Sequence, residues 1–443
     1  MNESAQGANS EDSAAKPLAG VRILHVTLDG PEHNPRMLKE NRTYIEAGAE
    51  VFSLVVGEQR ELDLHNDVDG ARLLAYRLSR LRALRAMIAS QALFRSRDLR
   101  RQIERVITEI EPDVIQPHDM FVAGSVFAAR TNVPVILDLH ENYPAATEQY
   151  RTAYPTLKRL LFALFQYRGR MDRIERRYIA RSAAVFTVTE EATDRVLKKC
   201  PQAIVATIPN VERRDFGSDT PGVTKQFGTH GSDQHLEPLR IVYTGGFEVL
   251  RGLHTVVRAL VLLPEAGGEQ PNVHLDLIGA RDSDYVRRLR GEVNKLNLAK
   301  RVTLHEWIPP EEVTARIDSA DLTLVPHEAN DQTNATIPHK LFQYMARGKP
   351  VLVSSCPPLA KHIRAADSGF VFTAGDERDC ACAITEALER RGDLQRLGEN
   401  GRRYVTEKMN WELVSEPALI SAVAELSTRG RRADSPSTSS LES

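Results

Sequence analysis

The sequence lacks three features that would each point to a particular class of protein. Its few cysteines do not have the pair-of-pairs spacing of a metal site; they are Cys200, Cys356, Cys380 and Cys382. No apolar run approaches the roughly 20 residues that span a bilayer, so any membrane contact is expected to be peripheral. The formal net charge of -2 lacks the basic excess of most nucleic-acid-binding domains. With no signal peptide ahead of the first apolar run, these features predict a cytoplasmic protein that does not bind nucleic acid.

What the sequence does contain is enough apolar material for more than one core. The chain has 443 residues, of which 42% are hydrophobic, and this length exceeds what one core usually supports. A stretch rich in Gly, Ser, Asp, Thr and His, from Glu212 to about Pro238, marks the boundary between two domains. The predicted organisation is a disordered lead over residues 1–19, a first domain over 20–215, a linker or extended loop over 216–237, a second domain over 238–409 and a disordered tail over 429–443.

Both halves alternate short apolar runs with helical patterns, which predicts parallel α/β domains. The strands expected in the first half are Val21–Thr27, Val51–Val56, Pro112–Gln116, Pro134–Leu139, Ala184–Val188 and Ala203–Ile208. Those expected in the second half are Leu239–Tyr243, Val273–Ile278, Val302–Leu304, Leu322–Val325, Val351–Val353 and Phe370–Phe372. Two doubly wound domains that face each other would place a binding site in the cleft between them.

The stretch from Ser319 to Ser355 predicts a strand, a polar loop, a helix that begins at Pro338 and a second strand. The loop of such a βαβ unit lies at the carboxyl end of the first strand, where open parallel sheets bind ligands. Free N–H groups at the start of the helix favour an anion, and the ammonium group of Lys340 is expected beside them. Arg251, after the first strand of the second half, is a second candidate cation. Together these features favour a phosphate-binding site.

Polar residues follow several strands of the first half. The loop after the first strand contains Gly30 and Arg36, which suit either the approach of a phosphate or a simple turn. A histidine and an acidic residue follow each of two later strands, at His118–Asp119 and His140–Glu141. The first pair is expected to form a turn, whereas the imidazole of His140 suits hydrogen bonding or proton movement near neutral pH. No metal site is expected from these spacings.

Two segments of the first half are strongly basic. Residues 72–105 contain ten arginines on a helical pattern, and residues 151–181 combine nine Lys and Arg with an apolar cluster at Leu160–Phe165. Both predict basic amphipathic helices. They are either solvated helix faces or contacts with an anionic membrane surface that would serve a membrane-bound acceptor.

The segments WIPPEEVTARIDSADLTLVP and TIPHKLFQYMARGKPVL, with LDLHENYP further upstream, resemble the family 4 glycosyltransferases over about Val21–Leu426. The resemblance implies the GT-B fold, in which two Rossmann-like domains face a central cleft and a C-terminal helix, here 410–428, packs back on the first domain. It also implies retaining transfer of a sugar from a nucleotide-sugar to a glycan or glycolipid acceptor in cell-surface glycan biosynthesis. Neither a metal nor another cofactor is implied.

The resemblance also assigns roles to residues. It implies catalytic roles for His140, Arg251 and Lys340. The implied donor-binding residues are Gly30, Gly245, Gly246, Ile337, Pro338 and Gln343. Residues of the acceptor side, or of uncertain role, are Arg36, Asp119 and Glu141.

Three positions depart from the family pattern, and one of them is Gly246, which stands where a first cation is common. Many members carry two glutamates where this chain has Ala335 and Gln343, one toward the donor sugar and one on the ribose hydroxyls. An amide can still hydrogen-bond a ribose diol, although without charge assistance. These departures keep open two alternatives: a non-catalytic nucleotide-sugar-binding homologue and a GT-B nucleotide-sugar epimerase.

Overall fold

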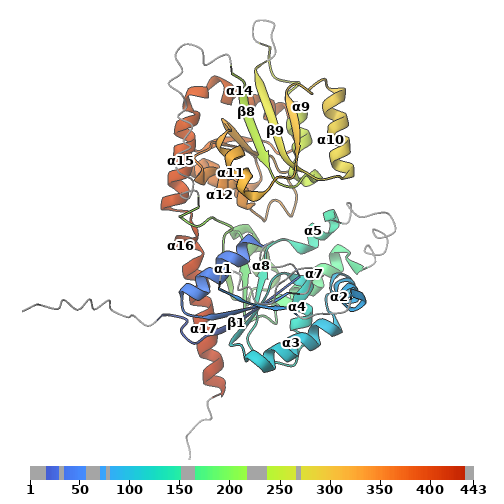
Figure 1. Cartoon of the computed structure of the whole chain (residues 1–443), viewed down its shortest axis with the longest axis vertical. Coiled ribbons are helices and arrows are strands. Elements are labelled where there is room, and N and C mark those ends of the chain that lie inside the picture. The colour runs from blue at the N-terminus through green and yellow to red at the C-terminus, as the bar shows by residue number, and fades with distance from the viewer. Residues whose placement is uncertain are drawn as a thin grey trace, which may run out of the picture.

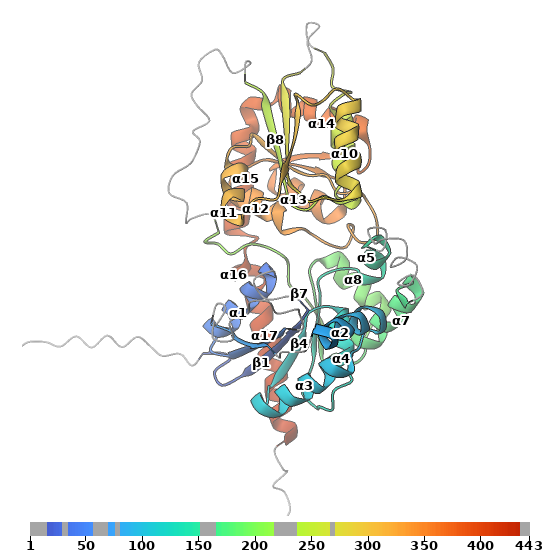
Figure 2. The same ribbon diagram turned by 45° about the vertical axis from the view of Figure 1, so that its right-hand side comes forward.

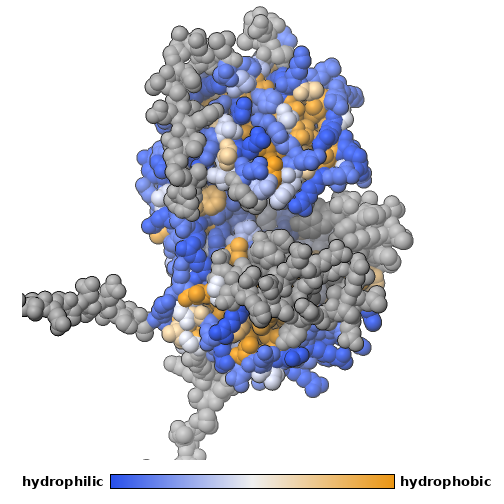
Figure 3. All heavy atoms as spheres, viewed as in Figure 1, coloured by the Kyte–Doolittle hydropathy of each residue, from blue (hydrophilic) through white to orange (hydrophobic). Residues whose placement is uncertain are grey.

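The computed structural model describes residues 16–28, 34–55, 70–75, 80–150, 165–216, 237–265 and 271–434. It has two α/β domains stacked along the long axis of the molecule, and the C-terminal helix runs beside the lower, N-terminal one (Figure 1). The view turned by 45° shows the same two layers of helices around each sheet (Figure 2). Hydrophilic side chains cover most of the described surface that faces the viewer (Figure 3).

The first domain is built on parallel strands. Four of them pair in the order β3 (Arg72–Ala75), β2 (Glu50–Val55), β1 (Arg22–Thr27) and β4 (Val114–Pro117). A second group follows as β5 (Ile136–Leu139), β6 (Ala184–Thr187) and β7 (Val205–Thr207). Parallel bridges between Ile115 and Val135 and between His118 and Asp138 join β4 to β5. The chain order reverses between β1 and β4, so ligands are expected where these strands end.

The helices of the first domain cover both faces of this sheet (Figure 2). They are α1 (Pro35–Glu46), α2 (Arg80–Leu93), α3 (Arg97–Ile110), α4 (Met120–Val126), α5 (Tyr143–Tyr150), α7 (Arg168–Ile179) and α8 (Glu190–Lys199). Helix α3 shows why they form, because Ser96 caps its first turn by accepting a hydrogen bond from Leu99 N. Its buried residues, Leu99, Ile103, Val106 and Ile110, repeat at helical spacing.

The second domain has a six-stranded parallel sheet. Its order is β10 (Val302–Glu306), β9 (Val273–Ala280), β8 (Leu239–Thr244), β11 (Leu322–Val325), β12 (Val351–Ser354) and β13 (Gly369–Phe372). The helices are α9 (Leu253–Ala259), α10 (Asp284–Lys295), α11 (Pro310–Asp318), α12 (His339–Ala346), α13 (Pro357–Ala366), α14 (Glu377–Glu389) and α15 (Leu394–Glu407). Two 3-10 turns, η3 (Val249–Arg251) and η4 (Arg391–Asp393), precede α9 and α15. The order reverses between β8 and β11, so the loops that begin at Gly245 and Pro326 flank the switch point.

The first residues of one expected helix form a strand instead. The arginine-rich pattern predicts a helix from Arg72 onward, but Arg72–Ala75 form β3, which pairs with β2. Ala71 and Leu73 are buried whereas Arg72 is exposed, and this alternation has the period of a strand. The helical part of the segment begins at Arg80 and breaks at Ser96, so α2 and α3 are separate helices.

The chain ends by crossing back to the first domain. Helix α16 (Trp411–Val414) lies at the junction of the domains, and α17 (Glu416–Asp434) packs against α1, β4 and β7. The indole of Trp411 is completely buried, and its Nε1 donates to Thr43 Oγ1 at 2.7 Å. Its backbone N–H donates to Glu212 O at 2.9 Å. None of the described helices is both long and apolar enough to cross a bilayer.

We therefore expect Trp411 to anchor the crossover. Trp411→Ala should lower the free energy of unfolding by about 3–5 kcal/mol, because it leaves a cavity and an unpaired Thr43 hydroxyl. The chain offers a matched control in its other tryptophan, Trp307, which is 54% exposed. Trp307→Ala should cost less than about 1 kcal/mol in the same urea titration. Equal losses for the two variants would contradict the anchoring role.

Candidate functional site

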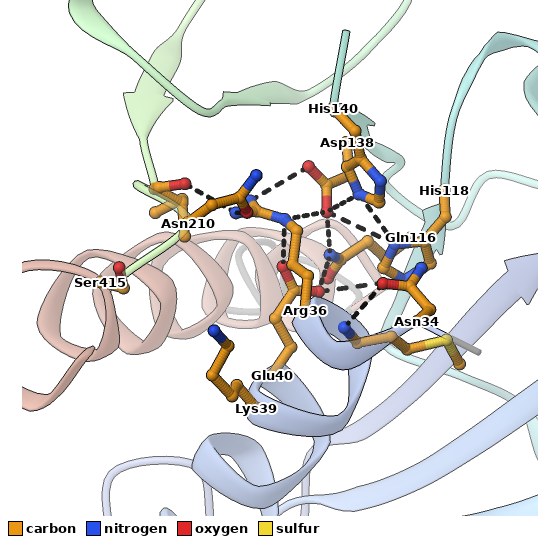
Figure 4. Close-up of polar contacts among 12 residues, drawn as sticks. Asn34, Arg36, Lys39, Glu40, Gln116, His118, Asp138, His140, Asn210 and Ser415 are labelled. Atoms are coloured by element: carbon orange, nitrogen blue, oxygen red, sulfur yellow. Dashed lines mark hydrogen bonds and ion pairs between the residues drawn. The ribbon is translucent and has the colours of Figure 1, made fainter. Parts of the chain in front are cut away.

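On the first domain, imidazole and carboxylate groups gather where β1, β4 and β5 end (Figure 4). His140 Nε2 lies 3.0 Å from Asp138 Oδ2, and His118 Nδ1 lies 3.4 Å from both of these atoms. On its other side His118 Nε2 lies 2.7 Å from His25 Nδ1. The side chain of His140 is 21% exposed, whereas the other three groups are buried. His140 is therefore the member of this cluster that a ligand can reach.

Arg36 holds the carboxylate at the centre of the cluster. Its Nε and Nη2 each lie 3.2 Å from an oxygen of Asp138, and its Nη1 donates to Ile208 O at 2.6 Å and to Asn210 Oδ1 at 3.1 Å. Burial would raise the pKa of Asp138, but Arg36 and then His140 hold it well below the ordinary value. Arg36 itself is 1% exposed. It holds Asp138 from the buried side, and its role at the acceptor stays a prediction.

A second buried carboxyl group lies beside this ion pair. Glu40 Oε1 lies 3.0 Å from Arg36 Nε, and its Oε2 accepts from Gln116 Nε2 at 2.8 Å. Burial, and then the negative charge of Asp138, raise the pKa of Glu40 well above the ordinary value. The pKa values of the two carboxyl groups beside this one guanidinium are therefore shifted in opposite directions.

Two overlapping trios in this cluster have the ligand types and spacing of a metal site. They are His25, Glu40 and His118, and His118, Asp138 and His140, whose ligand atoms lie within 4.8 Å of one another. Arg36 already neutralises the carboxylate of the second trio, and a cation beside it would have to overcome the repulsion of the guanidinium. The residues therefore fit a hydrogen-bonded network better than a metal centre.

On the second domain, Lys340 and Arg251 lie on the same side of the sheet, where β8 and β11 end. Lys340 Nζ lies 4.0 Å from the centre of the Tyr243 ring, and Arg251 Nη1 lies 3.2 Å from His327 Nε2. Gly245 makes this possible, because a Cβ atom there would meet Lys340 Nζ at 2.4 Å. Its φ of +130° also belongs to the region that favours glycine.

These two cations are only partly balanced, by the carboxylate of Glu248. Burial, and then the charge of Arg251, lower the pKa of Lys340 well below its ordinary value, against a raising effect of Glu248. Burial, Arg251 and Lys340 in turn lower the pKa of His327. Glu248 is the carboxylate paired with Arg251, at 3.7 Å. An anion at the start of α12 would relieve this excess of positive charge.

A pocket of about 380 Å³ adjoins these cations, a volume within the range of small-molecule sites. Its lining includes the strand ends at Thr244–Gly246 and Ile278–Gly279, together with Glu248, Arg281, Trp307 and Ile308. Gly246 has no heavy atom within 4 Å of an added Cβ, so this side of the pocket is open. The pocket combines an exposed aromatic ring, apolar groups and a cation, which suits a nucleoside next to a phosphate group.

The two domains meet at a buried carboxylate in the segment after β7. Glu212 Oε1 accepts from Gln343 Nε2 at 3.1 Å and lies 3.7 Å from His339 Nδ1. Its Oε2 lies 3.2 Å from Lys39 Nζ. Burial would raise the pKa of Glu212, but Lys39 and His339 hold it below the ordinary value. The amide of Gln343 therefore uses its donor group on Glu212 and leaves its oxygen for another partner.

The loop between β11 and α12 also contacts the first domain. Asn142 N donates to Gln332 Oε1 at 2.8 Å, and Asn142 Nδ2 donates to Asp331 O at 3.0 Å. Thr189 Oγ1 donates to Ala335 O at 2.9 Å. A second pocket, of about 290 Å³, lies between the domains and includes Asn142 and Ala335 in its lining. The cleft is thus bridged on two sides by hydrogen bonds.

The remaining residues expected at the site are found in several environments. Gly30 lies outside the described residues. Asp119 caps α4 by accepting from Phe121 N at 2.8 Å, and Glu141 is partly buried beside the cluster. Ile337 is buried, and Pro338 precedes the first turn of α12 as its N-cap residue. Arg251, Lys340, Gly245 and Gly246 are brought together, with His140 on the opposite domain.

Sequence reasoning missed several residues that shape the site. Asp138 and His25 lie inside strands, where a polar residue in an apolar run gives no sign of its partner. The available signal was the burial expected for β1 and β5, since a buried charge needs a counter-charge. Glu212 was assigned to the boundary stretch by its composition, although it is buried at the domain junction.

Comparisons with known proteins match both domains. The family model described as "Glycosyltransferase Family 4" matches residues 42–211, and that described as "Glycosyl transferases group 1" matches residues 231–404. The sulfoquinovosyl transferase SQD2 of Arabidopsis thaliana is 22% identical over 69% of this chain and 56% of its own length. The putative colanic acid biosynthesis glycosyltransferase WcaL of Escherichia coli is 28% identical over 40% of this chain and 43% of its own. The chain thus spans about half the length of these curated relatives.

Solved structures share the fold. A sucrose-phosphate synthase from Thermosynechococcus elongatus superposes with a TM-score of 0.65 at 17% identity, over 94% of this chain and 100% of that one. Anabaena HepE in complex with UDP and glucose also gives 0.65, at 14% identity, over 91% and 98%. WaaG, a glycosyltransferase involved in lipopolysaccharide biosynthesis, gives 0.59 at 15% identity, over 90% and 98%. The predicted GT-B fold class is confirmed.

The contact between Gln343 and Glu212 predicts that restoring the familial glutamate will be harmful. Gln343→Glu would place a second carboxylate about 3 Å from Glu212, and the repulsion raises the pKa of the introduced carboxyl group in the folded state. Below about pH 4 the introduced carboxyl group is protonated in both the folded and the unfolded state, so the free energy of unfolding should match that of the wild type. As pH rises to 7, the free energy of unfolding should fall below the wild-type value by about 1–3 kcal/mol.

Urea unfolding at several pH values measures this deficit. Gln343→Ala is the matched control, because it removes the same hydrogen bond without adding a charge, and its deficit should be constant over this pH range. A Gln343→Glu deficit that does not change with pH would show that Glu212 and residue 343 do not interact in solution.

Proposed function

Because the chain belongs to the family 4 glycosyltransferases, we propose that it transfers a sugar from a nucleotide-sugar to a glycan or glycolipid acceptor, with retention at the anomeric carbon. The observation that carries this proposal is the pair of cations, Lys340 at the start of α12 and Arg251 in η3, which have the carboxylate of Glu248 between them. Lys340 and Arg251 lie where the departing diphosphate of a donor would need neutralisation, and Gly245 leaves room for them. Backbone N–H groups of the first turn of α12 add further donors to the same anion.

The adjoining pocket suits the nucleoside of the donor. The exposed ring of Trp307 offers a surface for a base, and Gln343 Oε1 is free to accept from a ribose hydroxyl while Nε2 is bound to Glu212. HepE, which has the same fold, binds UDP and glucose in its solved complex. These points support a nucleotide-sugar as the donor.

His140 faces the donor side from the first domain. It is the partly exposed member of its cluster and lies near the loop that carries Ala335, through Asn142 and its contacts with that loop. The carboxyl groups behind it, Asp138 and Glu40, are completely buried and cannot reach an anomeric carbon. This supports a front-face transfer in which the leaving phosphate assists the acceptor, in contrast to the carboxylate pair of a retaining glycosidase.

The relatives guide the proposal about the acceptor. SQD2 is named a sulfoquinovosyl transferase, WcaL is assigned to colanic acid biosynthesis, and WaaG is involved in lipopolysaccharide biosynthesis. A lipid-linked or polysaccharide acceptor of a cell-surface glycan agrees with this range.

Donor binding is expected to stabilise the chain by mass action. In a thermal-shift panel of UDP, GDP, ADP and CMP sugars, one donor at a hundred times its dissociation constant should add about 2.7 kcal/mol. Lys340→Ala and Arg251→Ala should each weaken that donor tenfold or more, because each removes a charge-assisted contact of about 1.5–3 kcal/mol. Without donor, Lys340→Ala should be no less stable than the wild type, because it removes a poorly compensated cation.

Arg396→Ala is the matched control for these variants. Arg396 pairs with Asp367 on the surface of the second domain, at 2.7 Å, and its loss should leave the donor shift unchanged. Binding without any turnover of the donor would favour the non-catalytic homologue. If no nucleotide-sugar stabilises the wild type, the proposal is wrong.

A surface of the first domain supports peripheral contact with a membrane. Four apolar side chains are exposed there next to arginines; they are Ile88, Leu93, Phe165 and Tyr167. Arg170 Nη1 donates to Ala92 O at 3.1 Å and also to Phe165 O, so the end of α2 and the start of α7 lie side by side. Exposed arginines on the same segments include Arg85, Arg95, Arg97 and Arg173. Residues 76–79 and 151–164 of the predicted basic segments lie outside the described residues.

Vesicles test this contact. The chain should co-sediment with phosphatidylglycerol-containing vesicles at low salt and less so as salt increases, since each basic residue contributes about 1 kcal/mol near an anionic surface. Replacing both Ile88 and Leu93 with Asp should abolish the binding. The same replacement of Val261 and Leu262, which are 45% and 46% exposed on the second domain, should not. If the two double variants bind vesicles equally, Ile88 and Leu93 do not form the membrane contact.

A further inference from the structure

The first-domain cluster contains a buried carboxylate to which the transfer itself assigns no role. Asp138 Oδ2 is shared by His140 Nε2 at 3.0 Å, Arg36 Nε at 3.2 Å, and His118 Nδ1 and Gln116 Nε2 at 3.4 Å each. An ionised carboxylate oxygen only accepts hydrogen bonds, so each imidazole that contacts it must turn an N–H group toward it. The geometry therefore restricts which nitrogen of each ring carries the proton.

The chain of contacts from β1 to β5 is satisfied by one arrangement of protons. His25 Nδ1 donates to His118 Nε2, and His118 Nδ1 then donates to Asp138. The opposite arrangement would turn the lone pair of His118 Nδ1 toward an ionised carboxylate, which is repulsive. Burial lowers the pKa of both His25 and His118, so both rings are neutral and each has a single N–H group to place. His140 completes the set by donating from Nε2.

We propose that Asp138 is a positioning residue that fixes the tautomer of His140, with the proton on Nε2 and the lone pair on Nδ1. Among the contacts of the described residues, none reaches His140 Nδ1, and Nε2 faces the buried side. The exposed part of the ring therefore presents an acceptor rather than a donor. It can accept a hydrogen bond from a sugar hydroxyl group and so orient its oxygen in the cleft.

Arg36, His118 and His25 act through Asp138. The guanidinium fixes the plane of the carboxylate at two points, His118 Nδ1 contacts its Oδ2, and His25 acts on it through His118. The identity of the hydroxyl group rests on the proposed function, but the tautomer of His140 does not, because it is set by residues of this chain alone.

The tautomer is measured by long-range ¹H–¹⁵N spectra of the full chain labelled at histidine nitrogens, with His140→Gln to assign the resonances. The wild type should show His140 as the Nε2–H tautomer. In Asp138→Asn the side-chain amide can donate to Nε2, so the tautomer should change to Nδ1–H. Asp138→Glu keeps the carboxylate and should keep the Nε2–H form.

Asp318→Asn is the matched control, because it breaks a similarly buried pair, with Arg347 at 2.8 Å, in the other domain. It should leave the His140 resonances unchanged. A wild-type spectrum with the Nδ1–H tautomer would overturn the proposal whether or not the variants fold. The same holds if Asp138→Asn keeps the Nε2–H form.

Kinetics separate positioning from general support of the fold. With the donor found in the thermal-shift panel, Asp138→Asn should lower kcat by about tenfold to a hundredfold while changing the donor KM by less than about threefold. Asp138→Glu should recover part of kcat, and a fall in which KM alone changes would count against positioning. If the wild type turns over no donor, the proposed function is wrong, but the tautomer measurement still tests the role of Asp138.

Discussion

The buried ion pair between Arg36 and Asp138 is the interaction on which the first-domain side of the cleft depends. It joins helix α1 to strand β5, and the same guanidinium binds Ile208 O and Asn210 in the segment that leaves the domain. A buried charge without its partner costs several kcal/mol, so neither residue can shift alone. The positions of the strand ends, the orientation of His140 and the start of the crossover are therefore fixed together.

The two sides of the cleft handle charge in opposite ways. In the first domain each buried charge is matched within the protein, and the second carboxyl group, Glu40, is favoured in its neutral form. In the second domain Lys340 and Arg251 share the carboxylate of Glu248, which leaves an excess of positive charge there. A surface whose charges are paired within the protein thus faces a positively charged one, which suits an anionic ligand.

Sequence patterns predict most of this fold because its strands are buried on both faces. Leu322–Val325 and the helix at Leu394–Glu407 have the expected bounds, since apolar runs and caps act locally. β3 was missed because a four-residue edge strand inside an arginine-rich pattern has too little apolar sequence to stand out. The site residues depend on contacts that local patterns do not contain. Arg36 and Asp138 are separated by 102 positions, and Gln343 and Glu212 by 131.

The hydrogen bond between Gln343 and Glu212 ties the candidate phosphate site to the domain junction. Helix α12 carries Lys340 near one end and contacts the segment between the domains through Gln343, so its two functions share one rigid element. Under the proposed function, the diphosphate product would bind Lys340 on the same helix that holds Glu212 through Gln343, so its release would be coupled to any change at the domain junction.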